Sequence, residues 1–355
     1  MSGVTNLHLT HNSSGSKETY MSRIAVIGAG SWGTALAISL ARRGGHTLTL
    51  WAHSPSHADD IAATRTNTRY LPNFPVPEDI RITSSLTDAI EAAEIILCVT
   101  PSQALRATMQ QMAPALKPDQ ILLSASKGVE EKTFLRISQI MREFGPNPVG
   151  TLGGPSFAQE VAAALPTAIT IATEDSAPGS TEIAERLQND FTSASLRVYR
   201  NSDVPGTELG GALKNVIALA AGVANGLNLG HNSAAALITR GIAEMTRLAI
   251  ACGGQRETMS GLAGIGDLVL TCTGGLSRNR TVGVELGKGR KLPEIIASLN
   301  GKVAEGVLST TAALGLAARY GVEMPITEQM AAILHKDRSP RDAIRELMTR
   351  PGRTE

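Results

Sequence analysis

The sequence of 355 residues contains little aromatic side chain, little cysteine, no long apolar run and no excess of charge of one sign. Phe, Trp and Tyr make up 3% of the chain while apolar residues reach 42%, so the core must consist chiefly of Ala, Val, Leu and Ile. Lys plus Arg (33) nearly balance Asp plus Glu (32). Without a basic excess we expect no nucleic-acid partner. The length suits two or three domains.

The three cysteines, Cys98, Cys252 and Cys272, cannot all pair with one another, and none has C-x-x-C spacing. We therefore expect neither a disulfide framework nor a metal site, and a reducing, cytoplasmic compartment. No uninterrupted run reaches the about 20 apolar residues that a membrane helix needs. The best candidate, residues 216–224, ends at Asn225. A membrane span is not expected.

Residues 1–20 are polar and lack the apolar stretch of a signal peptide. We expect a disordered tail, or a start assigned too far upstream, because the first structured element begins near Met21. His8 and His11 in this tail are expected to be solvated rather than metal-bound.

The N-terminal half begins with a strand, a helix and a second strand. Residues 23–28 are apolar and β-branched, residues 31–43 are rich in Ala and Leu and end before two glycines, and residues 47–52 again form an apolar run. Such a βαβ unit has parallel strands and a right-handed crossover. Further strands are expected at 95–99, 121–126 and 168–172, and a proline-rich loop at 71–77.

The turn after the first strand carries G-A-G-S-W-G, with Gly28, Gly30 and Gly33 in a G-x-G-x-x-G pattern. These glycines permit a tight turn, the approach of a pyrophosphate to the backbone, and close packing of helix on strand. In a chain with 35 glycines the pattern can also mark a tight turn alone. Its place between strand and helix favours dinucleotide binding. We predict an α/β, Rossmann-like domain with a mostly parallel sheet over residues 21–203.

The kind of dinucleotide depends on the end of the second strand. NAD-preferring sites usually have Asp or Glu there, about 20 residues after the glycines. This chain has Ala52 and His53 instead. We expect NADPH, with NADH as the alternative, and His53 with Arg65 or Arg69 as the source of positive charge. The alternative for His53 is an ordinary surface position.

The C-terminal half is predicted to be all-α. Residues 208–226 and 233–252 are long Ala/Leu-rich segments, and small residues such as Gly210, Gly211 and Gly222 would let helices pack closely. Shorter helices are expected at 281–286, 292–299, 310–320 and 326–334. A turn-rich linker at 201–207 separates this domain, residues 204–355, from the first. The reaction cleft is expected between the two domains.

Two lysines and one mixed polar segment are candidates for chemistry. Lys214 lies within an apolar helix, where it is either used or extends to solvent from an amphipathic face. Lys127 follows a strand at the sheet edge where α/β folds bind ligands, or is a solvated loop residue. The segment 261–280 holds Asp267 and S-R-N-R, suited to a phosphate or carboxylate unless it is a solvated face. Cys272 lacks a local basic partner, so packing is expected.

Together these stretches resemble the bacterial-type NAD(P)-dependent glycerol-3-phosphate dehydrogenases over nearly all of residues 23–334. The matching segments begin at Ile24 (I-A-V-I-G-A-G-S-W-G-T-A-L-A), Val99 (V-T-P-S-Q-A-L-R), Ser126 (S-K-G-V-E), Gly153 (G-G-P-S-F-A-Q-E-V), Glu208 (E-L-G-G-A-L-K-N-V-I-A), Gly261 (G-L-A-G-I-G-D-L) and Ser277 (S-R-N-R). The chain departs from the family where Ala163-Ala164 replaces a common glycine and where Asn225-Gly226 replaces Asp-Gly.

The resemblance implies roles residue by residue. Lys214 matches the catalytic lysine that gives or takes the proton at the substrate's C2 oxygen, and Lys127 a lysine that contacts both cofactor and substrate. The other substrate contacts it implies are Gly154, Ser156, Asp267, Ser277, Arg278 and Asn279. The other cofactor contacts it implies are Ser31, Trp32, His53, Ala158, Arg278, Val303 and Glu305, beside Gly28, Gly30 and Gly33.

The implied reaction is the reversible reduction of dihydroxyacetone phosphate to sn-glycerol 3-phosphate for phospholipid synthesis, by a homodimer. An ammonium group near the ketone would stabilise the developing negative charge and deliver a proton, and no metal is needed. Two alternatives remain. A β-hydroxyacid dehydrogenase would share the two-domain plan but bind a carboxylate, and an NAD(P)-sensing module would keep the glycines without needing Lys127, Lys214 and Asp267.

Overall fold

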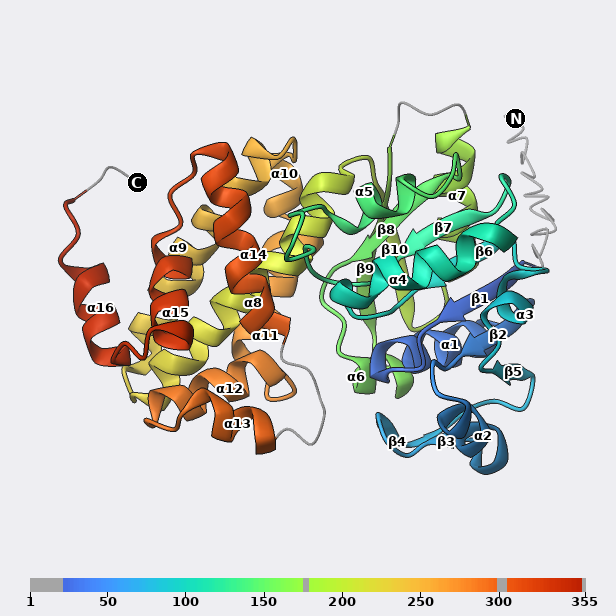
Figure 1. The fold of residues 1–355 in the computed structure, drawn as a ribbon, viewed down its shortest axis with the longest axis horizontal. Helices are drawn as coiled ribbons and strands as arrows, with labels where there is room; N and C mark the ends of the chain where they lie inside the picture. The colour runs from blue at the N-terminus through green and yellow to red at the C-terminus, as the bar shows by residue number, and fades with distance from the viewer. Residues whose placement is uncertain (1–21, 175–178, 299–304, 353–355) are drawn as a thin grey trace, which may run out of the picture.

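The computed structural model describes residues 22–174, 179–298 and 305–352. Figure 1 shows an α/β domain followed in sequence by a helical domain. The predicted fold class, an α/β Rossmann-like domain with a mostly parallel sheet plus an all-α domain, is confirmed. The predicted tail, residues 1–20, lies outside the described residues, as does Val303.

One eight-stranded sheet forms the centre of the α/β domain, in the order β10-β9-β8-β7-β6-β1-β2-β5. All neighbouring pairs are parallel except β8 and β9. The central strands are buried on both faces, which explains their continuous apolar sequences. The strands are β1 (Arg23–Ile27), β2 (Thr47–Trp51), β5 (Ile80–Thr83), β6 (Ile95–Cys98), β7 (Ile121–Ser124), β8 (Val149–Gly153), β9 (Thr167–Thr173) and β10 (Leu196–Asn201).

Helices cover both faces of this sheet, each with its own apolar cluster. On one face, side chains of α1 and α7 pack with Ile24, Val26 and Leu97; on the other, side chains of α3, α4 and α5 pack with Ala25 and Ile27. The helices of this domain are α1 (Ser31–Arg43), α2 (Pro55–Thr64), α3 (Leu86–Ile90), α4 (Ser102–Met112), the 3-10 turn η1 (Ala113–Ala115), α5 (Ile137–Arg142), α6 (Ala158–Ala162) and α7 (Ser180–Phe191).

Two expectations about connections are wrong. The proline-rich segment 71–77 contains a strand, β4 (Leu71–Pro75), which pairs antiparallel with β3 (Thr66–Asn67). Proline has no backbone N–H to donate to a neighbouring strand. It is tolerated here because each strand of a two-stranded sheet has an edge without a neighbour. The expected linker 201–207 is partly helical, because Asp203 caps a helix by accepting a hydrogen bond from the amide of Gly206 at 2.7 Å.

The helical domain is built around α8, which is buried along most of its length. Gly222 and Gly226 of α8 face Gly283 and Gly287 of α12 so closely that a Cβ at Gly222 would lie 2.2 Å from the carbonyl oxygen of Arg280. The elements are α8 (Val204–Gly226), α9 (Gly230–Ala251), α10 (Arg256–Met259), the π-helical turn η2 (Leu262–Gly266), α11 (Asp267–Thr273), α12 (Arg278–Gly287), α13 (Leu292–Ser298), α14 (Glu305–Tyr320), α15 (Pro325–His335) and α16 (Pro340–Met348).

Within the described ranges, no single helix is long and apolar enough to cross a membrane. One pair of segments, Arg256–Thr273 and Arg278–Gly287, meets the length and composition requirement only as a unit bent by 50°.

Candidate active site

Lys214 and Lys127 bind the two oxygens of one carboxylate. The Nζ of Lys214, on α8, donates to Oδ1 of Asp267, the first residue of α11. The Nζ of Lys127, beyond the end of β7, donates to Oδ2 at 2.8 Å. The Lys214, Asp267 and Lys127 side chains are 8%, 1% and 16% exposed. Residues far apart in sequence thus form one buried cluster with two positive charges and one negative charge.

The cluster changes the proton affinity of all three groups. Burial, reinforced by repulsion from the Lys127 ammonium, lowers the pKa of Lys214 to about 8 against the attraction of Asp267. Burial alone would lower the pKa of Lys127 too, but the charge and hydrogen bond of Asp267 outweigh it and raise that pKa. Burial disfavours the charged form of Asp267, yet the two ammonium groups hold its pKa below the usual range. Lys214 is therefore the group able to exchange a proton near neutral pH.

Two adjacent glycines of α8 lie at the contacts of this helix with η2 and with Lys127. At Gly210, a Cβ would lie 2.2 Å from the carbonyl oxygen of Ala263, so η2 and the start of α11 can approach α8 closely. At Gly211, a Cβ would lie 3.6 Å from Cγ of Lys127, whose chain crosses the helix there. The sequence expectation of close helix packing through small residues is confirmed at Gly210.

The S-R-N-R segment forms the start of α12 beside Lys214. The hydroxyl of Ser277 caps the helix by accepting from the amide of Arg280 at 3.2 Å. The Asn279 side chain, buried at 8% exposure, donates to Oδ1 of Asn215 at 2.9 Å and accepts from the amide of Gly306 at 2.9 Å. Arg278 is exposed. Ser277 and Asn279 therefore have structural partners already, and Arg278 is the member whose charge faces solvent.

The G-G-P-S-F segment lies next to the same cluster. Gly154 follows β8 with φ +113°, and the hydroxyl of Ser156 donates to its carbonyl oxygen at 3.1 Å. Pro155 is in contact range of Gly266, the residue before Asp267. Ala158 begins α6. This segment is thus brought to the end of α11 that carries the acid.

The glycine turn has the geometry expected for a dinucleotide. Gly28 has φ +127° and contacts the backbone of Val99, while a Cβ at Gly33 would lie 1.9 Å from the carbonyl oxygen of Gly28. At Gly30 no described atom lies within 4 Å of a Cβ position, which leaves the approach to the N-terminus of α1 open. Trp32 has a buried Nε1 without a partner among the described residues. These residues fit a dinucleotide pyrophosphate.

The residues predicted to supply positive charge at the end of β2 are His53 and Arg65 or Arg69. His53, the first residue beyond Ala52, is exposed, and its ring lies 5.8 Å from that of Trp51, edge to face. The guanidinium of Arg65 is used elsewhere, since it donates to the carbonyl oxygen of Ile80 at 3.1 Å and pairs with Glu78 at 3.1 Å. Arg65 therefore has structural partners already, and the expectation that Arg65 or Arg69 assists His53 at a 2′-phosphate stays a prediction.

Glu305 begins α14, which faces the first turn of α4. It lines a hollow of about 320 Å³ with Leu308 and the first residues of α4, Pro101, Ser102, Gln103 and Ala104. Burial raises the pKa of Glu305, opposed by the charges of Arg278, Lys127 and Lys214. The position predicted for the far end of the cofactor thus lies within electrostatic reach of both lysines.

Sequence reasoning missed two polar residues of this cluster. Asn215 is 4% exposed and holds Asn279, and Thr271 is 4% exposed with its hydroxyl 3.5 Å from Oδ1 of Asp267. For Thr271 the available signal was its position four residues after Asp267, which places the two on one face if the segment is helical, whereas Asn215, directly after Lys214, offered no such spacing. Cys272 is buried and its pKa is raised to about 12 by burial, so its thiol is inert.

Both domains of the chain match models of one protein family. Residues 23–178 match the profile of the NAD-dependent glycerol-3-phosphate dehydrogenase N-terminus, and residues 203–345 that of the C-terminus. The chain belongs to this family. The bacterial-type resemblance drawn from the motifs is confirmed.

Individual relatives agree with that assignment. Glycerol-3-phosphate dehydrogenase [NAD(P)+] of Koribacter versatilis is 59% identical over 340 residues, covering 94% of this chain and 99% of the relative. The crystal structure of glycerol-3-phosphate dehydrogenase from Coxiella burnetii has a TM-score of 0.88 at 40% identity, covering 93% and 99% of the two chains. A ketopantoate reductase from Ralstonia eutropha, at 17% identity and TM-score 0.57, shares the fold alone.

Proposed function

We propose that this chain catalyses the reversible NAD(P)H-dependent reduction of dihydroxyacetone phosphate to sn-glycerol 3-phosphate, the backbone of glycerophospholipids. Membership of the NAD-dependent glycerol-3-phosphate dehydrogenase family supports this reaction. The observation that carries the proposal is the buried pairing of Lys214 and Lys127 with Asp267, where the end of β7 meets α8 and α11.

In this proposal Lys214 moves the proton. When bound, the reduced dinucleotide supplies hydride to the C2 carbonyl carbon. The Lys214 ammonium stabilises the negative charge that develops on the C2 oxygen and donates a proton to it, and in the reverse direction the neutral amine takes that proton back. A pKa of about 8 leaves both forms of Lys214 accessible near neutral pH. Asp267 holds both lysines in place and balances one of their charges.

The remaining predicted residues would bind and orient the two molecules. The exposed Arg278 would contact the substrate phosphate from the start of α12, assisted by Ser277 and Asn279. Gly154 and Ser156 would line the substrate from the opposite side. Lys127 would contact both molecules.

The cofactor would lie along the carboxyl edge of the sheet, on the open backbone at Gly30. The other proposed contacts are Gly28, Ser31, Trp32, Gly33, His53, Ala158, Arg278, Val303 and Glu305. Because no acid follows β2, we propose a preference for NADPH over NADH.

The direct test follows the loss of reduced-nicotinamide absorbance with dihydroxyacetone phosphate, comparing NADPH with NADH under identical conditions. We expect rapid oxidation, faster with NADPH. A 2-oxo acid is the control substrate, and it should not be reduced. Reduction of the 2-oxo acid in place of the ketone phosphate would favour the hydroxyacid alternative, and binding of NADPH without any turnover would favour the sensing alternative.

We further propose a cytoplasmic homodimer with a domain boundary at residues 203/204. Free thiols at Cys98, Cys252 and Cys272 support a reducing compartment. Exposed apolar side chains on the helical domain, including Ile250 at 42% and Leu276 at 45%, support self-association. Sedimentation equilibrium tests it, since a monomer at micromolar concentration would contradict the dimer.

A further inference from the structure

Lys127 is followed by a closed loop, residues 128–136. A β-bridge between Val129 and Arg136 joins its two ends, and the amide of Glu130 donates a hydrogen bond to the carbonyl oxygen of Leu135 at 3.0 Å. The bridge and the hydrogen bond hold the two ends of the loop together. The loop begins at the residue directly after Lys127.

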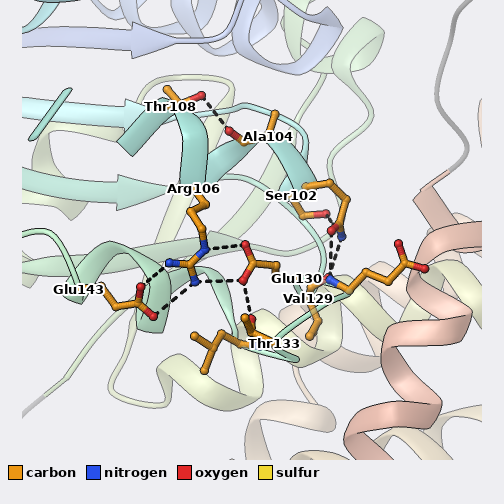
Figure 2. A network of polar contacts seen from close by, with 11 residues as sticks. Ser102, Ala104, Arg106, Thr108, Val129, Glu130, Thr133 and Glu143 are labelled. Carbon is orange, nitrogen blue, oxygen red and sulfur yellow. Dashed lines mark hydrogen bonds and ion pairs between the residues drawn. The ribbon is translucent and has the colours of Figure 1, made fainter. Parts of the chain in front are cut away.

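Helix α4 holds this loop to the α/β domain, as Figure 2 shows. The guanidinium of Arg106 donates two hydrogen bonds to the carboxylate of Glu130, Nε to Oε1 at 2.8 Å and Nη2 to Oε2 at 2.9 Å. Gln103 adds a donor to the carbonyl oxygen of Val129 at 2.9 Å and an acceptor for the amide of Glu131 at 3.0 Å. Paired, charge-assisted bonds of this kind fix direction as well as distance.

The Arg106–Glu130 pair is sheltered from solvent on the side of Glu130. The Glu130 and Arg106 side chains are 10% and 27% exposed, and the hydroxyl of Thr133 also donates to the Glu130 carboxylate. The Arg106 hydrogen bonds lower the pKa of Glu130, so the pair stays charged at neutral pH. Glu143, beyond the end of α5, binds the same guanidinium but is 43% exposed and lies outside the loop.

The helical domain contacts the other side of the loop. Val129 is 3% exposed and packs in the core of that domain. The Phe134 ring fits against Gly315 of α14, where a Cβ would lie 2.1 Å away, and the guanidinium of Arg319 lies 5.4 Å from the ring centroid. Arg319 also donates to the carbonyl oxygen of Thr133 at 3.1 Å. The loop that follows Lys127 is thus held by α4 on one side and by α14 on the other.

We propose that Arg106 and Glu130 are positioning residues whose paired hydrogen bonds hold the 128–136 loop so that the Lys127 ammonium stays on Asp267, beside Lys214. The proposal rests on the proposed function, in which these lysines serve ketone reduction. The joint between Lys127 and the loop supports it. Gly128 has φ +147° and a Cβ there would lie 2.4 Å from Oγ of Ser102, so this joint packs directly against the first residue of α4.

The Glu130→Gln variant of the full chain tests the proposal, since it keeps the shape and removes the charge. We expect kcat to fall by about 10- to 100-fold. The groups facing Lys214 are Asp267 and Lys127, with Glu305 and Cys272 nearby. Retreat of the Lys127 ammonium removes a repulsion, so the basic limb of the pH–rate profile should move upward by about one unit.

Two further variants make the result specific. Glu143→Gln disturbs the same guanidinium without touching the loop, and should leave kcat and the basic limb unchanged. Arg106→Lys keeps a cation but loses the paired geometry. It should show the same fall in kcat and the same upward movement of the basic limb, and it serves as the test if Glu130→Gln does not fold.

A double-mutant cycle with Lys127→Met completes the test. If Glu130 acts through Lys127, adding Glu130→Gln to Lys127→Met should lower kcat no further. An undiminished second loss, or an active wild-type protein whose Glu130→Gln variant keeps the normal rate and basic limb, would overturn the positioning role alone. A wild-type protein without ketone reduction would overturn the proposed function and this inference together.

Discussion

The Lys214 ammonium donates a hydrogen bond to the Asp267 carboxylate across 53 residues of sequence, with both side chains less than a tenth exposed. Neither charge would be stable there alone, because burial of an unpaired ion is costly. With Lys127 on the second carboxylate oxygen, the cluster carries one net positive charge. That balance suits a site in which negative charge develops on a ketone oxygen next to a phosphate.

Asp267→Asn should lower kcat for ketone reduction by about 100-fold and move the basic limb of the profile below pH 8. The sign follows from the charges. The carboxylate favours the Lys214 ammonium, so its removal lowers the pKa of Lys214, and the protonated form needed for reduction is lost at lower pH. The measurement is kcat/KM against pH with saturating cofactor.

Asp203→Asn provides the matched control for this substitution, because Asp203 is also buried but caps α8. It should lower the melting temperature and leave the profile in place. An upward movement of the limb in Asp267→Asn would contradict the account.

Gly30→Ala and Gly33→Ala should separate cofactor binding from folding. At Gly30 the backbone has φ −76° and a Cβ meets open space, so the melting temperature should be unchanged while the dissociation constant of the dinucleotide rises about tenfold. At Gly33 the Cβ would overlap the carbonyl oxygen of Gly28, so stability should fall by about 1–3 kcal/mol. Thermal denaturation and cofactor titration check both variants. If the two variants weaken dinucleotide binding equally and do not differ in stability, the separate roles of Gly30 and Gly33 in this turn would be contradicted.

His53→Asp should shift the ratio of kcat/KM values for NADPH and NADH towards NADH by roughly tenfold or more. An acid at the end of β2 can accept a hydrogen bond from a ribose 2′-hydroxyl and repels a 2′-phosphate. His53 is exposed, so the substitution should not disturb folding. An unchanged ratio would show that His53 is an ordinary surface position.

Ala164→Gly should stabilise the protein by about 1 kcal/mol. Ala164 has φ +61° after α6, and the amide of Leu165 donates to the carbonyl oxygen of Glu160 at 3.0 Å, the pattern of a helix end that favours glycine. Ala163, at φ −74°, is the matched control, and Ala163→Gly should destabilise. Denaturant unfolding of both variants measures the two changes in stability. A loss of stability in Ala164→Gly would contradict the claim that Ala164 is strained at this φ.

Local patterns predicted the glycine turn, the long helices and Lys214, because each rests on neighbouring residues or a helical period. Contacts between residues far apart in the sequence could not be predicted from local patterns. Nothing in the spacing links Arg106 with Glu130, and β4 was missed because its two prolines suggested a loop. The prediction that Lys127 and Lys214 share a site came from the family resemblance. That Asp267 joins them by both oxygens is known only from the structure.

The most direct test of the account is turnover of Lys214→Ala with dihydroxyacetone phosphate, together with NADPH binding measured by fluorescence titration. Lys288→Ala, on an exposed lysine that pairs with Glu285, is the matched control and should behave as wild type. We predict that Lys214→Ala binds NADPH within about threefold of wild type while kcat falls by about 1,000-fold or more. Near-normal turnover in this variant would contradict the assignment of Lys214 as the proton donor.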